Sequence, residues 1–306
     1  RFWRCQWMQA MPGAGIGALL AALMLPAAAT PAWAESRAAT DVQLLGSWAT
    51  GGRVPAYVSK PEPSSSLRGP RGHPVVVVAH HAVGVYHDTF LREFCDALAR
   101  EGYLAVLPDF FHRIWSDAVP RGQNVSTDGM DIPAMLASQR DAEVIEDLRA
   151  TLDLLAEPSW SADVERAAVL GFCMGGRIAW LAGVTRALAP FVRAAVAYHG
   201  GSLWKANPPG LGVAPGDRLP DLACPVLGHF GSKDSNPSPQ DMERLREEAA
   251  AAGKVVEFHS YESAKHGFSC RDSVNYLASA AEEAWPRTLA FLGRTLGSPR
   301  EMRSDL

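Results

Sequence analysis

Cys173 lies in a short stretch, residues 171–176 (GFCMGG), whose pattern Gly-x-Cys-x-Gly suits a nucleophile held on a sharp turn. The preceding residues 166–170 predict a short buried strand, and residues 177–187 predict a helix. Glycines on both sides leave room for neighbouring backbone, and the start of a helix favours the thiolate over the thiol. We therefore predict a reactive cysteine on an exposed turn. The alternative is a buried structural cysteine before a glycine-rich turn.

A cysteine nucleophile needs a general base and a group that orients this base, and two candidates follow along the chain. Asp234 comes soon after the apolar run 225–230, and His266 follows the alternating run 255–261. We expect both side chains on loops at the carboxyl ends of successive strands. There Asp234 would hold one nitrogen of His266 while the other takes the proton of Cys173. Taken singly, Asp234 also fits a turn and His266 a surface position.

The elements that must position these residues alternate between strand and helix along the chain. We predict an α/β fold with a mostly parallel central sheet and helices on both faces. Residues 110–137 lack a clear period and predict either a cap over the cleft or a surface loop. The other predicted elements are a hairpin at 41–58, strands at 75–79, 102–109 and 194–198, and helices at 88–100, 138–156 and 239–252.

A glycine-rich loop, residues 199–203 (HGGSL), follows the predicted strand 194–198 at the carboxyl edge of the sheet. Ligands of open α/β sheets bind at this edge. We therefore predict that the flanking aromatic residues, Tyr198 and Trp204, wall the substrate pocket. The alternative is a plain turn.

From about residue 42 to residue 296 the chain resembles the dienelactone hydrolases, α/β-hydrolases in which a cysteine replaces the serine of the nucleophile turn. The resemblance is carried by residues 102–109 (GYLAVLPD), 171–176 (GFCMGG), 231–234 (GSKD), 261–268 (YESAKHGF) and 276–281 (YLASAA). It implies an oxyanion hole formed by the backbone amides of Ala82 and Met174. It also implies hydrolysis of a small cyclic enol lactone, dienelactone, to maleylacetate through an acyl-cysteine, as in a carboxymethylenebutenolidase.

The chain departs from this family at the end of the strand 75–79. Family members carry a glutamate there that pairs with the resting cysteine, whereas this chain has His81. An imidazolium at this position would keep Cys173 ionised without substrate. The alternative is a histidine that hydrogen-bonds backbone at the edge of the cleft.

A second departure concerns the two arginines with which the family grips the substrate's carboxylate. Four residues after His266 the chain has Cys270, and Arg271 is one residue further on, while residues 126–135 contain no arginine. The sequence therefore does not demonstrate a carboxylate clamp. Three residues are nevertheless assigned to the substrate pocket: His81, Phe268 and Arg271.

Residues 1–34 predict a signal peptide, with Arg1 and Arg4, an apolar run at 14–25 and Ala-Trp-Ala before Glu35. An uncleaved anchor is the alternative. The remaining residues, 35–306, are expected to form one α/β-hydrolase domain in the periplasm or outside the cell, with no stable membrane insertion. The chain has 29 Lys and Arg against 33 Asp and Glu and no basic cluster, so nucleic acid is not an expected partner.

The cysteines and histidines show no metal-binding spacing, and no metal or cofactor is predicted. Three histidines could be imagined as metal ligands, but no fourth ligand follows in a metal-binding pattern: His80, His81 and His87. One disulfide among Cys95, Cys224 and Cys270 stays open as an alternative. Cys95 and Cys224 fit better as small buried side chains.

Three function classes follow from these residues. The first is a cysteine-dependent hydrolase, monomeric, that cleaves a small lactone or ester. The second is the same framework acting on another acyl compound, such as a thioester or other activated ester, because the arginine clamp is missing. The third is a non-catalytic binding protein on the same scaffold. The ordered set Cys173, Asp234 and His266 argues against the third, because binding alone does not require it.

Overall fold

The computed structural model describes residues 43–45, 54–85, 89–114, 130–207 and 213–297. The predicted signal peptide, His87 and the turn of the predicted hairpin 41–58 lie outside these ranges. Within them, no helix is both long and apolar enough to cross a bilayer.

One sheet of eight strands forms the centre of the molecule, in the order β1-β2-β4-β3-β5-β6-β7-β8. Its first two strands pair antiparallel with each other, and β2 pairs antiparallel with β4, whereas all other neighbours run parallel. The prediction of a mostly parallel central sheet is confirmed. The strands are β1 (Gln43–Leu45), β2 (Val54–Ser59), β3 (His73–Ala79), β4 (Leu104–Pro108), β5 (Ala162–Phe172), β6 (Val192–Tyr198), β7 (Val226–Gly231) and β8 (Val256–Tyr261).

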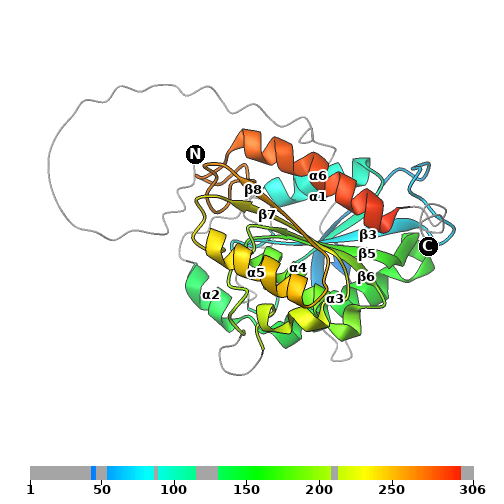
Figure 1. Cartoon of the computed structure of the whole chain (residues 1–306). Helices are drawn as coiled ribbons and strands as arrows, with labels where there is room; N and C mark the ends of the chain where they lie inside the picture. The colour runs from blue at the N-terminus through cyan, green and yellow to red at the C-terminus, as the bar shows by residue number, and fades with distance from the viewer. Residues whose placement is uncertain (1–42, 46–53, 86–88, 115–129, 208–212, 298–306) are drawn as a thin grey trace, which may run out of the picture.

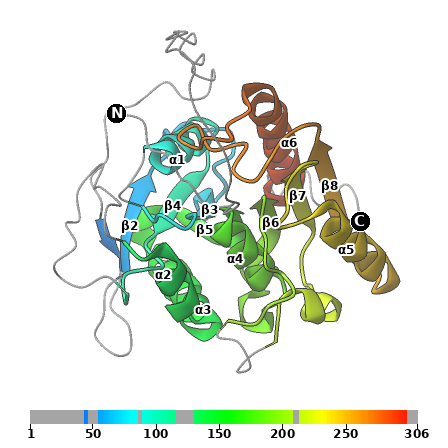
Figure 2. The same cartoon turned by 90° about the vertical axis from the view of Figure 1, so that its left-hand side faces the viewer.

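Helices cover both faces of this sheet (Figure 1). Helices α1 (Phe90–Arg100) and α6 (Ala278–Leu296) lie on one face. The other face carries α2 (Ile132–Ser138), α3 (Asp141–Leu155), α4 (Met174–Gly183) and α5 (Pro239–Ala251), as Figure 2 also shows. Short 3-10 turns at Pro158–Trp160, Arg186–Leu188 and Gly216–Asp221 complete the connections.

Two apolar clusters fill the space between the sheet and its two helical layers. Successive side chains of a strand point to opposite faces, and β3 shows this directly. Val75 and Val77 pack in the cluster of α3 and α4, whereas Val76 and Val78 pack in the cluster of α1 and α6. Because the parallel strands are covered on both faces, their residues are nearly all apolar.

The structure corrects two predicted helices. Residues 138–156 do not form a single helix, because α2 ends at Ser138 and α3 begins at Asp141 after two residues with extended backbone. The end of the segment 110–137 thus belongs to α2 and is helical. Asp131 caps this helix by accepting a hydrogen bond from the Ala134 amide at 3.0 Å. The helix after the nucleophile turn begins at Met174 and not at residue 177, so Cys173 itself is the capping residue.

Candidate active site

Cys173 lies on a strained turn between β5 and α4. Its backbone has φ 55° and ψ −114°, a conformation that costs free energy for any residue with a side chain. The turn is held from both sides, because a Cβ on Gly175 would lie 2.0 Å from the Ala79 oxygen of β3. On the other side, the Cys173 amide donates to the Tyr198 oxygen of β6 at 3.0 Å. This packing presents the thiol at the carboxyl ends of the strands, where a nucleophile turn places it.

The two other predicted side chains meet beside this cysteine. His266 Nδ1 hydrogen-bonds Asp234 Oδ2 at 3.0 Å, and the imidazole also interacts electrostatically with the Cys173 sulfur. Asp234 is buried, and its other oxygen accepts from the Asn236 amide at 2.9 Å, so the carboxylate is fixed on both sides. The loops after β5, β7 and β8 thus bring together one thiol, one imidazole and one carboxylate.

The charges of this group stabilise an ionised cysteine. Burial alone would raise the pKa of the Cys173 thiol, but His266, His81 and the Met174 amide together lower the pKa below its usual value. Burial alone would lower the pKa of His266, yet the Cys173 sulfur and the Asp234 carboxylate raise this pKa to about 11. The arrangement therefore favours the thiolate and imidazolium forms of this pair over the thiol and the neutral imidazole.

The two amides assigned to the oxyanion hole come from adjacent segments. The Met174 amide is one of the groups that lower the pKa of the Cys173 thiol. Ala82 lies in a turn directly after β3, and this turn is next to Cys173, because Ala79 pairs with Gly171 across β3 and β5. His81 lies in the same turn, is partly exposed, and acts electrostatically on the Cys173 thiol.

Tyr198 and Phe268 do not line the pocket, and these two predictions are wrong. The Tyr198 side chain is 2% exposed, and its hydroxyl hydrogen-bonds Thr288 Oγ1 of α6 at 2.6 Å. It points away from the cleft because it occupies the strand position that faces the α1 and α6 layer. Phe268 is fully buried in the same apolar cluster, where its ring contacts His199.

Trp204 and Arg271 are engaged elsewhere. The Trp204 ring packs on Gly216 and beneath the Arg244 guanidinium of α5, 3.5 Å from the ring centroid. Arg271 forms an ion pair with Glu93 at 2.6 Å and donates to Thr89 Oγ1 at 3.3 Å. Both partners belong to the first residues of α1 and its cap. The one arginine proposed to replace the family's clamp is therefore already neutralised by a carboxylate.

His199 is a site residue that the sequence reasoning did not single out. It is buried with φ 39°. The Cys173 amide, which also donates to the Tyr198 oxygen, donates to His199 Nδ1 at 3.2 Å. Its Nε2 hydrogen-bonds Ser269 Oγ at 3.0 Å. Burial above all, with the nearby histidines His266 and His81, lowers the pKa of His199 well below its usual value, so this imidazole is neutral. The feature of the sequence that could have identified His199 is a titratable residue directly after a buried strand.

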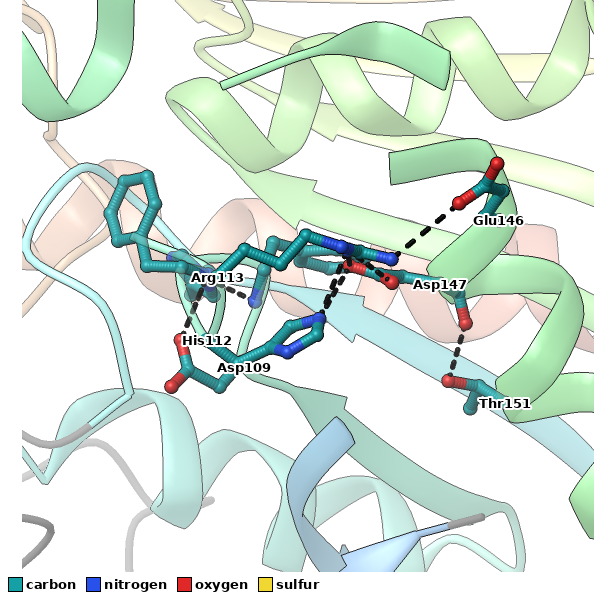
Figure 3. A network of polar contacts seen from close by, with 9 residues as sticks. Asp109, His112, Arg113, Glu146, Asp147 and Thr151 are labelled. Carbon is teal, nitrogen blue, oxygen red and sulfur yellow. Dashed lines mark hydrogen bonds and ion pairs between the residues drawn. The ribbon is translucent and has the colours of Figure 1, made fainter. Parts of the chain in front are cut away.

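A polar network fixes the segment that follows β4 (Figure 3). The buried Asp147 of α3 accepts hydrogen bonds from Arg113 Nη1 at 2.6 and 2.7 Å and contacts His112 Nε2 at 3.1 Å. Nearer to β4, Asp109 accepts from the Phe111 amide at 2.9 Å. Residues 109–113 are thereby tied to α3, on the side of the sheet that carries α4.

The described cysteines are all free. Cys95 and Cys224 are buried, as predicted, and the disulfide that was left open does not form among the described residues. In the described part of the chain, no group of three or more histidine, cysteine or acidic side chains is placed to hold a metal ion.

Comparison with known proteins places this geometry in one family. The model of the dienelactone hydrolase family matches residues 55–296. A putative carboxymethylenebutenolidase of Escherichia coli K12 is 34% identical over 251 residues, which cover 79% of this chain and 82% of that protein. The carboxymethylenebutenolidase of Pseudomonas putida is 30% identical over 219 residues, which cover 72% and 85%. A crystal structure of a putative dienelactone hydrolase from Klebsiella pneumoniae matches with a TM-score of 0.66 and 32% identity, covering 79% of this chain and 94% of that one.

Proposed function

This chain belongs to the dienelactone hydrolase family, and we propose that it cleaves a small lactone or ester through an acyl-cysteine on Cys173. The family and the relatives named carboxymethylenebutenolidase support a carboxylic ester hydrolase. The observation that carries the cysteine mechanism is the contact of His266 with both the Cys173 sulfur and the Asp234 carboxylate.

In the acylation half of the reaction, the Cys173 thiolate attacks the carbonyl carbon of the substrate. The carbonyl electron pair moves to oxygen, and the amides of Met174 and Ala82 stabilise this oxyanion. When the tetrahedral intermediate collapses, the bond to the alcohol oxygen breaks, and the leaving oxygen takes the proton of the His266 imidazolium. For a lactone, the released hydroxyl stays attached to the acyl group.

In the second half, neutral His266 removes a proton from water, and the resulting hydroxide attacks the thioester carbonyl. Collapse of this second intermediate breaks the carbon–sulfur bond and returns the thiolate beside the imidazolium. The product is the free acid, which loses its proton to solvent. Asp234 stays a carboxylate throughout and stabilises the charged imidazolium, which is the ordinary role of the third residue in such a site.

A second candidate is an ester or thioester without a carboxylate, and the Arg271 ion pair favours it. A carboxylate clamp requires a guanidinium whose positive charge is available to the substrate, whereas the charge of Arg271 is already paired with Glu93, and its Nη2 also donates to Thr89 Oγ1. Matched substrates that differ only in a free carboxylate or its methyl ester separate the two candidates by their kcat/KM values.

The test of the proposed function is turnover of a panel of small lactones, aryl esters and thioesters, with and without a thiol-blocking reagent. We expect hydrolysis of at least one class, with complete loss on blocking. Turnover that survives in Cys173→Ala would contradict the mechanism. Binding of these compounds without turnover in the wild type would instead favour the non-catalytic binding protein.

We also propose that the protein is exported, on the basis of the leader-like residues 1–34, and that the exported protein is a monomer. Sequencing the amino terminus of the protein recovered from a periplasmic extract tests this: Glu35 is expected as the first residue. A cytoplasmic protein that retains residues 1–34 would contradict it. Light scattering after size-exclusion chromatography measures the number of subunits.

A further inference from the structure

His80 is fully buried at the end of β3, and its two ring nitrogens have partners that fix the position of its proton. Nδ1 lies 2.8 Å from the His81 oxygen, and Nε2 lies 3.0 Å from the Phe110 amide nitrogen. A carbonyl oxygen only accepts hydrogen bonds and a backbone amide only donates them. His80 is therefore neutral, with its hydrogen on Nδ1.

Among the described residues, the carboxylate of Asp109 lies beside this ring and does not change the assignment. Asp109 Oδ1 is 3.9 Å from His80 Nε2, beyond hydrogen-bond distance, and it accepts from the Phe111 amide at 2.9 Å. The amide of Phe110 is the closer group and occupies the Nε2 lone pair.

This proton position determines which way the next peptide group points. The His81 oxygen accepts from His80 Nδ1 and from the Gly84 amide at 3.0 Å. The peptide between His81 and Ala82 is trans, since the one cis bond in the described ranges is Asn236–Pro237. In a trans peptide the C=O and N–H bonds point in opposite directions. The Ala82 amide is thus directed away from the buried His80.

The nucleophile turn lies against the same segment. A Cβ on Gly175 would lie 2.8 Å from the His80 oxygen, and Ala79 and Gly171 are register partners in β3 and β5. The segment 80–84 and the turn of Cys173 therefore meet at one edge of the sheet. The Ala82 amide therefore belongs to a segment that lies beside the nucleophile turn.

We propose that His80 is a positioning residue of the oxyanion hole: its Nδ1–H holds the His81 carbonyl so that the Ala82 amide stays directed at the reacting carbonyl oxygen. This inference rests on the proposed function, because it assigns a role within the same reaction. It differs from the family resemblance, which names the amide donors but not the group that orients one of them.

The surroundings of His80 keep its ring in place. The ring packs against Phe110 and Phe111, with centroid distances of 5.7 and 4.9 Å. Both phenylalanines belong to the segment that the network of Figure 3 ties to α3. A rigid support is what an oxyanion donor needs, because it must be in position before the charge develops.

The experiment compares His80→Gln with His80→Asn. An asparagine amide reaches the place of Nδ1 and can still donate to the His81 oxygen, whereas a glutamine amide reaches the place of Nε2 and leaves that oxygen with the Gly84 amide but without a side-chain donor from residue 80. Two rates are measured for each variant: acylation of Cys173 by an activated ester, and alkylation by iodoacetamide. Only acylation develops an oxyanion, while both reactions need the thiolate.

We expect ester acylation in His80→Gln to fall by about 100-fold, the scale of losing one oxyanion donor, with iodoacetamide alkylation unchanged. The loss should appear in kcat and not in KM. His80→Asn should keep acylation within about tenfold of the wild type. Thermal unfolding of each variant checks that it is folded.

Unchanged acylation in His80→Gln would overturn the inference, as would an equal loss of acylation and alkylation. If His80→Gln does not fold, a 100-fold loss of acylation in folded His80→Asn overturns it equally. Failure of the proposed function gives a different result, because Cys173→Ala would then retain turnover whatever residue 80 is.

Discussion

The imidazole of His199 lies edge-on against the imidazole of His266, with ring centroids 5.0 Å apart and an interplanar angle of 63°. The same ring accepts a hydrogen bond from the Cys173 amide. One buried, neutral side chain thus contacts both members of the thiolate and imidazolium pair. A base next to an imidazolium must itself stay uncharged, and burial ensures this by lowering the pKa of His199.

Replacing His199 should disturb the orientation of the reacting groups more than the binding of substrate. In His199→Phe the ring remains but its hydrogen bonds are lost, and we expect kcat to fall by about tenfold with little change in KM. Steady-state kinetics on one activated ester measures the two parameters. Ser269→Ala, which removes the hydroxyl partner of Nε2 and keeps the Nδ1 contact, is the matched control and should have the smaller effect. A rise in KM with unchanged kcat would show that His199 contacts substrate instead.

Hydrolysis slowed at its second step should accumulate an acyl group on Cys173. Because His266 activates the water that removes this group, His266→Ala should lower turnover by at least about 100-fold. Mass spectrometry of the intact variant, quenched after incubation with an activated ester, should show the mass of one acyl group, located on the peptide that contains Cys173. A labelled lysine or serine peptide with an unmodified Cys173 would be incompatible with the mechanism.

The pH dependence of Cys173 alkylation tests the role of His81. A thiolate reacts and a thiol does not, so a lowered pKa keeps the alkylation rate high to a lower pH. His81 is one of the groups that lower the pKa of Cys173, and a carboxylate in its place repels the thiolate. In His81→Glu the midpoint of the alkylation profile should therefore shift to higher pH, towards the value of about 8.5 of an isolated cysteine or above it.

The control for this experiment is His259→Glu, a change of the same charge on β8, where the histidine contacts Glu257 and not the active site. It should leave the profile in place. Identical profiles for the wild type and His81→Glu would mean that His81 only lines the cleft, as the plainer interpretation of the sequence has it.

Freeing Arg271 should change the substrate preference. In Glu93→Gln the ion pair is lost while the shape of the side chain is kept. We expect kcat/KM for a carboxylate-bearing ester to rise by about fivefold or more relative to its methyl ester, because the charge of the guanidinium is then no longer paired with Glu93. The ratio of the two kcat/KM values is the measurement. Glu93→Gln combined with Arg271→Ala should return this ratio to the wild-type value, and an unchanged ratio in Glu93→Gln would place Arg271 out of reach of substrate.

Much of the site follows from local sequence patterns. The strand, turn and helix around Cys173 are adjacent in sequence, and Asp234 and His266 each follow a run that is strand-like by itself. Parallel strands bring their carboxyl ends to one edge of the sheet, so the sequence pattern alone predicts that the three side chains are neighbours. The contacts of His266 with the other two residues agree with that expectation.

The pocket residues were harder to predict, because they depend on which face of the sheet a side chain occupies. Strand β6 is buried on both faces from Ala194 to Tyr198, so its sequence shows no alternation that would assign Tyr198 to a layer. The environment of Arg271 depends on Glu93, which lies far away in the sequence and meets it only through the packing of α1. His80 and His199 were hidden for a related reason: their roles lie in contacts with backbone atoms of distant segments.

The reactivity of Cys173 depends on β8, the last strand of the sheet in sequence order. Its thiolate is stabilised by His266, which stands on the loop after β8, and β8 is the final strand at one edge of the sheet. Without β8 paired to β7, His266 would not reach Cys173, and the thiol would lack the group that does most to lower its pKa. The acidity of the nucleophile is therefore a property of the assembled sheet and not of the turn that carries it.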